Sequence, residues 1–188
     1  MSQENAEIVR KPLAVRARSH RTLDQRLSLR FPRLAAAFLQ RIFKLPPNSR
    51  IRQASLRRGI SLALEAYNRR DLEAVVIGWD DEFEYHPDAN WVKAGIMEPC
   101  YRGFDDYRRY VAAGDEVWGG ENRLKPAELI DLGERIVLLA DGRMRGQVSG
   151  VPLAEAFALV STIEDGRFVH HQEYYDHAAA LEAVGLSE

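Results

Sequence analysis

The chain has 188 residues, of which 46% are hydrophobic and 29% charged, and its formal net charge is −2. This length suits one domain with a real core, and this balance is typical of a soluble globular protein rather than a disordered one. The single cysteine, Cys100, excludes both an intramolecular disulfide and a cysteine-based zinc site. No apolar run approaches the roughly 20 residues of a spanning helix, and the N-terminus lacks the apolar core of an export signal.

The charges are distributed unevenly along the chain. Residues 1–58 carry 14 Lys and Arg against 3 Asp and Glu, whereas residues 59–188 carry 12 against 25. A basic arm therefore precedes an acidic body. Such an arm suits an anionic surface, such as lipid headgroups or the acidic body of a partner subunit. Nucleic acid is not expected, because aromatic and basic residues are not interleaved on a recognisable platform.

The arm divides into two predicted segments. Residues 1–21 show no usable periodicity and are predicted to form a disordered basic tail. Residues 22–54 are predicted to form a basic amphipathic helical extension, whose first helix runs from Thr22 and ends at Pro46-Pro47. Its apolar residues recur at helical spacing, at Leu34, Phe38, Ile42 and Leu45. Two interpretations remain open: the helix packs on the body, or it lies on a membrane surface.

Residues 55–188 are predicted to form the body. Helical patterns cover Ile51–Asn68, Asp71–Trp79, Gly103–Trp118 and His177–Val184. Strand patterns cover Glu82–His86, Arg123–Leu132, Arg135–Val148, Leu153–Ile163 and Arg167–Tyr175. This order predicts an α+β fold with a curved antiparallel sheet and helices packed on one of its faces.

Five segments together resemble the SnoaL-like, polyketide cyclase-like branch of the nuclear transport factor 2-like superfamily. They are AYNRRDLEAV (66–75), WDDEFEYHPD (79–88), YRGFDDYRRYV (101–111), LIDLGERIVLLADGRMRG (129–146) and EDGRFVHHQEYYDHAAALEAVGL (164–186). The resemblance implies a cone, in which a strongly bent sheet and its helices enclose an apolar pocket, and it implies a homodimer. Members include cyclases, ketosteroid isomerases, epoxide hydrolases and non-catalytic binding domains, so the fold alone predicts no reaction.

The segment HHQEYYD near the C-terminus carries the first group of candidate site residues. Adjacent side chains on a strand point to opposite faces, so His170 and His171 cannot both bind one ion. No metal site is predicted there or elsewhere in the chain. By resemblance to limonene epoxide hydrolases, Glu173 falls where those enzymes carry a catalytic aspartate, and His171 and Tyr175 share its face. A carboxyl group in an apolar cavity has a raised pKa and suits general acid–base chemistry.

The same resemblance points to Asp141 and Arg143, at the place of an Arg-x-Asp pair that is reversed here. Arg143 would then adjust the pKa of the Glu173 carboxyl group. A structural ion pair of Arg143 with Asp141 or with Glu173 is an equal alternative. Gly142 leaves the strand register open, because glycine often marks a bulge. His86 precedes a proline where ketosteroid isomerases carry their general base, and it is the preferred acid–base candidate. The alternative is a histidine with a structural role at a strand end. The isomerases' oxyanion donors fall at Ala158 and about Ala63, which argues against that reaction.

The remaining candidates are ligand contacts. Pocket-wall and ligand-binding positions are predicted at Trp79, Glu84, Trp91, Tyr101, Phe157, Leu159, His171 and Tyr175, with Trp91 and Tyr101 as a lid. No phosphate-binding loop is present, so no nucleotide cofactor is predicted. These residues predict a cytoplasmic protein that binds a small apolar or polycyclic molecule and performs cofactor-free cyclisation, isomerisation or hydrolysis. The alternative is a non-catalytic binding or dimerisation module that the arm docks to a membrane or partner.

Overall fold

The computed structural model describes residues 9–13, 18–118, 123–145 and 152–186. Its helices are α1 (Leu23–Arg30), α2 (Pro32–Phe43), α3 (Arg50–Asn68), α4 (Leu72–Val75), α5 (Ala89–Lys93), α6 (Gly103–Trp118) and α7 (His177–Glu182). Its strands are β1 (Val9–Pro12), β2 (Trp79–His86), β3 (Tyr101–Arg102), β4 (Arg123–Asp131), β5 (Arg135–Arg145), β6 (Pro152–Glu164) and β7 (Arg167–Tyr174). The fold is α+β, as the sequence predicts.

The strands form one sheet of seven, in the order β1-β4-β5-β6-β7-β2-β3. Strands β4 to β7 are the predicted antiparallel meander. β2 pairs with β7 in parallel, which the expectation of a fully antiparallel sheet missed. These two strands are distant in sequence, so no hairpin turn dictates their direction. Gly142 pairs regularly with Leu124 and Glu155, and the irregular register in β4–β5 lies instead between Pro126 and Glu128.

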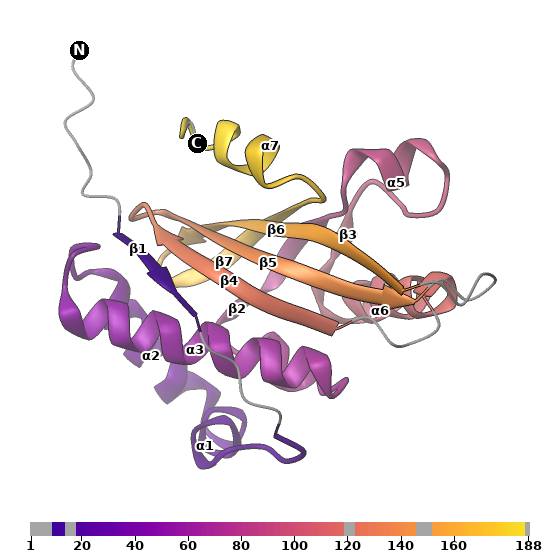
Figure 1. Cartoon of the computed structure of the whole chain (residues 1–188). Coiled ribbons are helices and arrows are strands. Elements are labelled where there is room, and N and C mark those ends of the chain that lie inside the picture. The colour runs from indigo at the N-terminus through magenta and orange to yellow at the C-terminus, as the bar shows by residue number, and fades with distance from the viewer. Residues whose placement is uncertain (1–8, 14–17, 119–122, 146–151, 187–188) are drawn as a thin grey trace.

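Helices cover both faces of the sheet, whereas the sequence predicted one. Figure 1 shows α1 to α3 beneath the sheet and α7 above it. The run IVLLA in β5 explains this, because successive side chains on a strand point to opposite faces and an unbroken apolar run makes both faces apolar. Ile136 and Leu138 join the core on the α3 side, while Val137 and Leu139 pack with Leu181 of α7.

The helical extension is two helices rather than one. Thr22 caps α1 in a reciprocal capping box with Gln25, as Thr-x-x-Gln is suited to do. The break falls at Phe31, whose backbone leaves the helical region because Pro32 follows it. Pro32 then starts α2, where its missing N–H costs nothing. Among the described residues, no helix has the length and hydrophobicity needed to cross a membrane.

One side of α2 packs against the body and the other side is exposed. Ile42 is buried, and Gly166, in the turn between β6 and β7, lies directly against the backbone of Gln40. Leu34 and Phe38, from the row of apolar residues identified in the sequence, are 69% and 56% exposed. The extension thus packs on the body and still presents an apolar surface, so the two interpretations are compatible.

Replacing Gly166 by alanine tests the contact between α2 and the sheet. An added Cβ would clash with the Gln40 backbone at its Cα, and Gly166 has a φ of +77°. Overpacking should lower the free energy of unfolding by about 1–3 kcal/mol, measured by urea denaturation. This loss adds to the cost of placing alanine at a positive φ. Gly95→Ala is the control for that cost, because its φ is +71° and nothing lies near its Cβ. Equal losses in the two variants would show that the contact with Gln40 is unimportant.

The N-terminal tail is not wholly irregular. Val9–Pro12 forms β1 and pairs with β4, opposite residues 128–131. This corrects the prediction of a disordered tail for those residues; residues 1–8 and 14–17 lie outside the described part of the chain. The predicted extension of β5 to Val148 likewise falls partly outside it, because residues 146–151 are not described.

Candidate functional site

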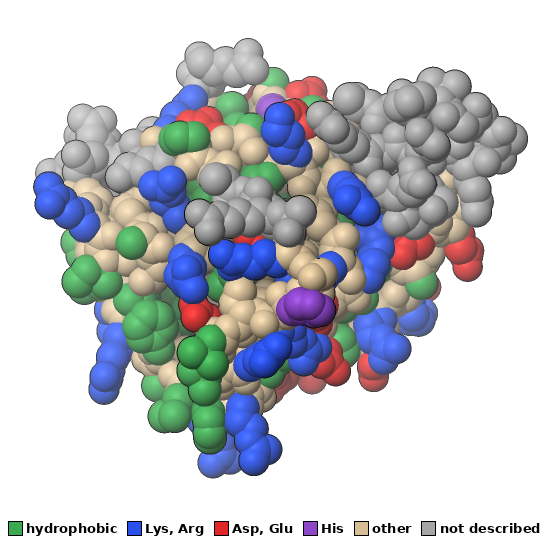
Figure 2. Space-filling view, turned by 60° about the horizontal axis from the view of Figure 1, so that its bottom comes forward, with side chains coloured by type: hydrophobic (Ala, Val, Ile, Leu, Met, Phe, Trp, Pro, Cys, Tyr) green, Lys and Arg blue, Asp and Glu red, His purple; other side chains and the backbone are tan. Residues whose placement is uncertain are grey.

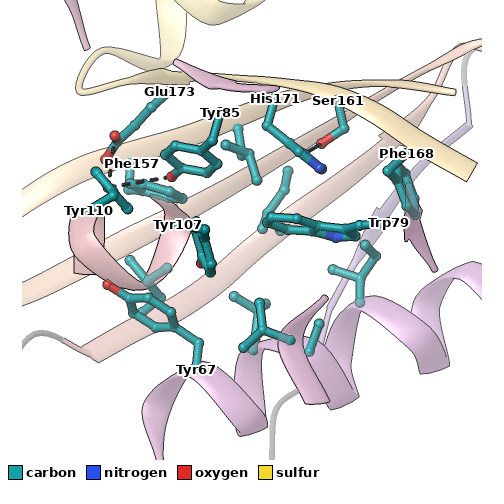
Figure 3. Close-up of a pocket in the computed structure, with 17 residues that line it drawn as sticks. Tyr67, Trp79, Tyr85, Tyr107, Tyr110, Phe157, Ser161, Phe168, His171 and Glu173 are labelled. Carbon is teal, nitrogen blue, oxygen red and sulfur yellow. Dashed lines mark hydrogen bonds between the residues drawn. The ribbon is translucent and has the colours of Figure 1, made fainter. Parts of the chain in front are cut away.

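A pocket lies between the sheet and helices α3, α4 and α6, with a volume of about 70 Å³. Figure 3 shows its lining side chains, which come from these helices and from strands β2 and β4 to β7. Most of the wall is apolar, and Trp79, Phe157 and Leu159 belong to it as predicted. The polar members are Tyr67, Tyr85, Tyr107, Tyr110, Ser161, His171 and Glu173.

Glu173 is the acidic residue of this wall. It is 1% exposed, because alternation along β7 directs it and His171 to the inner face. Burial raises the pKa of its carboxyl group to about 7, and a hydrogen bond from Tyr110 opposes that rise. The Tyr110 hydroxyl donates to Oε2 at 2.9 Å, whereas Oε1 is buried without a hydrogen bond of normal geometry among the described residues. The result is a carboxyl group that exchanges its proton near neutral pH.

Tyrosine hydroxyl groups surround this carboxyl group. Tyr107 and Tyr110 lie three residues apart on α6 and therefore share the helix face directed at the sheet. The hydroxyl group of Tyr85, on β2, donates to that of Tyr110 at 3.4 Å. Burial raises the pKa of all three phenols well above the ordinary value, so they keep their protons at neutral pH. This cluster was not predicted from the sequence, although the pair YRRY is a usable signal.

His171 lies beside Glu173 on the same face of β7. Its Nδ1 atom is 2.9 Å from the Ser161 hydroxyl oxygen, and its ring lies against that of Trp79 at 3.8 Å between centroids. Burial lowers the pKa of His171 to about 3, so the ring is neutral at physiological pH. Its Nε2 atom is buried and has no hydrogen-bond partner within the described part of the chain. His171 therefore offers one free nitrogen in the pocket wall.

Of the predicted lid residues, one lies beside a second, smaller cavity. Trp91 of α5 and Tyr175 line that cavity, and their rings are 5.8 Å apart. Glu173 and Tyr110 belong to the walls of both cavities, so Glu173 separates them. Tyr101 lines neither; it is 3% exposed and packs against the Tyr110 ring. The prediction that Tyr101 covers the pocket is therefore wrong.

Three other predicted residues lie away from the pocket. Phe83 and Tyr85 of β2 point inward, so Glu84 and His86 lie on the opposite face, hydrogen-bonded to each other at 3.2 Å. His86 as the acid–base group of the pocket, and Glu84 as a ligand contact, are thus corrected. Asp141 is exposed and alternates with buried Ala140, on the far side of β5 from the pocket. It cannot join Glu173, and the side chain of Arg143 lies outside the described residues.

The chain matches no protein-family model, and a search of curated proteins finds no match. Solved structures do resemble it. An NTF2-like protein of unknown function from Burkholderia pseudomallei is 26% identical, with a TM-score of 0.57 over 68% of this chain and 95% of that one. TerC, co-crystallised with polyporic acid, is 23% identical, with a TM-score of 0.56 over 66% and 94%. A SnoaL-like protein from Burkholderia thailandensis is 18% identical, with a TM-score of 0.50 over 66% and 97%.

These structures establish the class of fold. The chain has the cone fold of the nuclear transport factor 2-like superfamily, to which the SnoaL-like proteins belong. The fold fixes where a pocket lies, and the residues in its wall decide its chemistry.

Proposed function

We propose that the chain binds a small, largely apolar molecule in this pocket and that Glu173 transfers a proton to or from it. The observation that carries the proposal is a carboxyl group, 1% exposed in an aromatic and aliphatic wall, with its pKa raised to about 7. One of its oxygens is buried without a hydrogen bond of normal geometry among the described residues. A general acid or base works best when its pKa lies near the operating pH. A core residue with a purely structural role has no need of such a costly group.

The neighbouring groups have roles that follow from their protonation. When ionised, Glu173 takes a proton from a carbon next to a ligand carbonyl or from an attacking water, and Tyr110 holds the carboxylate in place. If the Ser161 hydroxyl donates to Nδ1 of His171, the imidazole proton is on Nε2. That N–H then donates to a ligand oxygen on which negative charge develops. This chemistry fits isomerisation, cyclisation or hydrolytic opening without a cofactor.

The size of the pocket limits the ligand. Its volume of about 70 Å³ is under half of the roughly 150 Å³ of a dry cavity known to bind benzene. A polycyclic ligand therefore requires wall side chains to move, and the second cavity beyond Glu173 is the adjacent space. TerC was co-crystallised with polyporic acid, and its fold resembles this one. Single-ring phenols, ketones and epoxides are the classes to test first.

A thermal-shift screen of the intact protein against these classes tests the proposal. A ligand at a hundredfold excess over its dissociation constant stabilises the native state by about 2.7 kcal/mol. We expect hits that Glu173→Gln weakens, and loss of any turnover in that variant. Glu164→Gln, a change at an exposed carboxylate, is the control and should leave binding unchanged. Hits or turnover that are identical in wild type and Glu173→Gln would contradict the proposal.

A second proposed function is docking to an anionic lipid surface through the outer side of α1 and α2. Five large apolar side chains there are 49–69% exposed, and we call them the apolar ridge: Leu23, Leu27, Phe31, Leu34 and Phe38. Exposed arginines lie among them at Arg26, Arg30, Arg33 and Arg41. Figure 2, which turns this side forward, shows hydrophobic side chains gathered beside Lys and Arg side chains. This combination is typical of helices that lie in a membrane interface.

Sedimentation with vesicles tests the apolar ridge. The intact protein should pellet with phosphatidylserine-containing vesicles and less with neutral ones, since each basic residue near such a surface contributes about 1 kcal/mol. Leu34→Glu with Phe38→Glu should remove the binding. Ile96→Glu, at an apolar residue exposed elsewhere, is the control. Failure of wild type to pellet would instead favour a partner subunit on this ridge.

Two further properties stay proposals. The chain forms a homodimer, which sedimentation velocity tests, and it lies in the cytoplasm, peripheral to the inner membrane face.

A further inference from the structure

A cluster of side chains that bind metals well lies on the face of the sheet opposite the pocket. Glu84 and His86 are two residues apart on β2 and share that face. β3 pairs antiparallel with β2, with Glu84 opposite Arg102 and Tyr85 opposite Tyr101. Continuing this register by one residue places Cys100 opposite His86. The sequence analysis could not bring Cys100 here, because the intervening loop and α5 hide the pairing.

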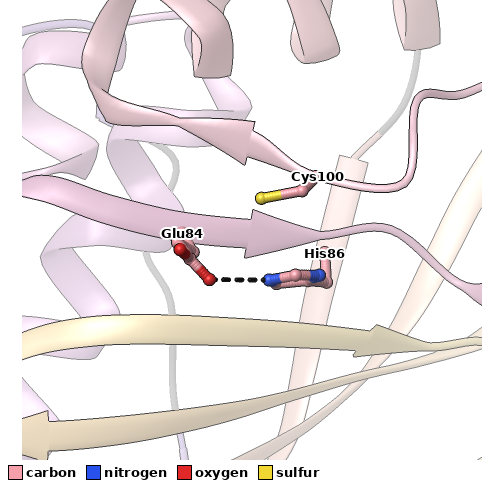
Figure 4. A group of neighbouring side chains, drawn as sticks. All are labelled: Glu84, His86 and Cys100. Carbon is pink, nitrogen blue, oxygen red and sulfur yellow. Dashed lines mark hydrogen bonds and ion pairs between the residues drawn. The ribbon is translucent and has the colours of Figure 1, made fainter.

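The three ligand-type atoms are already close together. One ligand atom each from Glu84, His86 and Cys100 lie within 4.8 Å of one another, and all three residues are half-buried. Figure 4 shows Cys100, the residue that precedes β3, beside the Glu84–His86 pair, which is hydrogen-bonded at 3.2 Å. Ligands around a tetrahedral zinc ion lie about 3–4 Å apart, given bonds of about 2.0–2.3 Å. Small side-chain rotations would therefore bring the three atoms into a coordination sphere.

We propose that Glu84, His86 and Cys100 bind a divalent transition-metal ion of the zinc class, with the remaining position open to water. A thiolate and an imidazole favour such an ion over Mg²⁺ or Ca²⁺, which take oxygen ligands. The sequence predicted no metal site, because one cysteine cannot build a cysteine-based zinc site, whereas a mixed site needs only one cysteine. Because the cluster lies on the other face of the sheet, the proposal is independent of the chemistry of Glu173.

Two neighbours shape the site. Arg102 forms an ion pair with Glu84, and its side chain is 60% exposed, so it is free to swing into water when an ion takes the carboxylate. His170, opposite Glu84 on β7, stacks on the His86 ring at 4.7 Å between centroids. It holds that ring from the side away from Cys100 and thus positions a ligand without being one. Arg102 opposes metal binding, so its removal should strengthen it.

Titration of the metal-free intact protein with Co²⁺ tests the site. Cys100 is the only cysteine in the chain, so a thiolate-to-cobalt charge-transfer absorption reports this ligand alone. We expect one equivalent of Co²⁺ to produce the band and Zn²⁺ to abolish it. Cys100→Ser should remove the band. Glu84→Gln and His86→Ala should each lower the affinity for Co²⁺ by at least about 10- to 100-fold. That is the loss seen when a residue that only supports a ligand is removed, and these two residues are ligands themselves.

Two further variants sharpen the result. Arg102→Gln should bind Co²⁺ more tightly than wild type, since Glu84 is then unpaired in the metal-free protein. Glu82→Gln, an exposed carboxylate on the same strand, should change nothing. Circular dichroism of each variant without metal separates loss of ligand from loss of fold. Absence of the band in wild type, or a band that persists in both His86→Ala and Glu84→Gln, would overturn the proposal.

Discussion

Replacing Arg52 by methionine should lower the free energy of unfolding by about 3–5 kcal/mol, because it leaves a buried charge without its partner. Arg52 and Asp131 are each 2% exposed, and two guanidinium nitrogens donate to the two carboxylate oxygens at 2.8 and 2.7 Å. The third nitrogen donates to the backbone oxygens of Phe43 and Leu45. One side chain therefore joins the end of α2 to α3 and β4.

Urea denaturation of Arg52→Met and Arg58→Met compares the loss of stability at a buried ion pair with the loss at an exposed one. Arg58 also pairs with an aspartate, Asp24, but the two side chains are 59% and 47% exposed. Its loss should cost at most about 1 kcal/mol. The double variant Arg52→Met with Asp131→Leu should recover much of the stability lost in Arg52→Met, since no unpaired charge remains. Similar losses for Arg52→Met and Arg58→Met would show that the buried pair has no special role.

Glu173→Gln should change how stability depends on pH. The folded-state pKa of Glu173 is raised from 4.5 to about 7, so between these values the native state holds a proton that the unfolded state has lost. Stability from this group is therefore fully present below pH 4.5 and falls as pH rises through 7. The shift corresponds to about 3 kcal/mol. Glutamine removes this dependence, and the variant should be more stable than wild type at pH 8.

His171 contributes the opposite trend, so wild type alone is not a sufficient test. Its pKa is lowered to about 3, and stability is lost as pH falls from 6.5 towards that value. The difference between wild type and Glu173→Gln, measured by urea denaturation from pH 5 to 8, cancels this contribution. Glu164→Gln is the matched exposed control and should parallel wild type. A constant difference between wild type and Glu173→Gln across that range would refute the raised pKa.

The sequence predicted the parts of the fold and site that depend on local periodicity. The alternation of β7 placed His171 and Glu173 together, and apolar spacing found α3, α6 and the meander. His86 was assigned instead by matching its following proline to a family position. Regular alternation along β2 turns Phe83 and Tyr85 inward and therefore places His86 on the opposite face.

Long-range pairings were beyond the sequence. Arg52 lies on a basic amphipathic helix, where an arginine is normally solvated, and its partner is 79 residues away. The tyrosines around Glu173 come from β2 and α6, and only the folded chain shows that they meet. The exposed ridge of α1 and α2 follows from a break at Pro32 that periodicity alone did not detect.

The proposed proton transfer depends above all on the pKa of the Glu173 carboxyl group, which is the property to measure first. Carbon-13 NMR of the intact protein with labelled glutamate follows each side-chain carboxyl through a pH titration, and Glu173→Gln assigns the resonance. We expect one carboxyl resonance that titrates near pH 7 and is absent from the variant. If the resonance lost in Glu173→Gln titrates near 4.5, the ordinary value, Glu173 is not the neutral-pH proton carrier of this pocket.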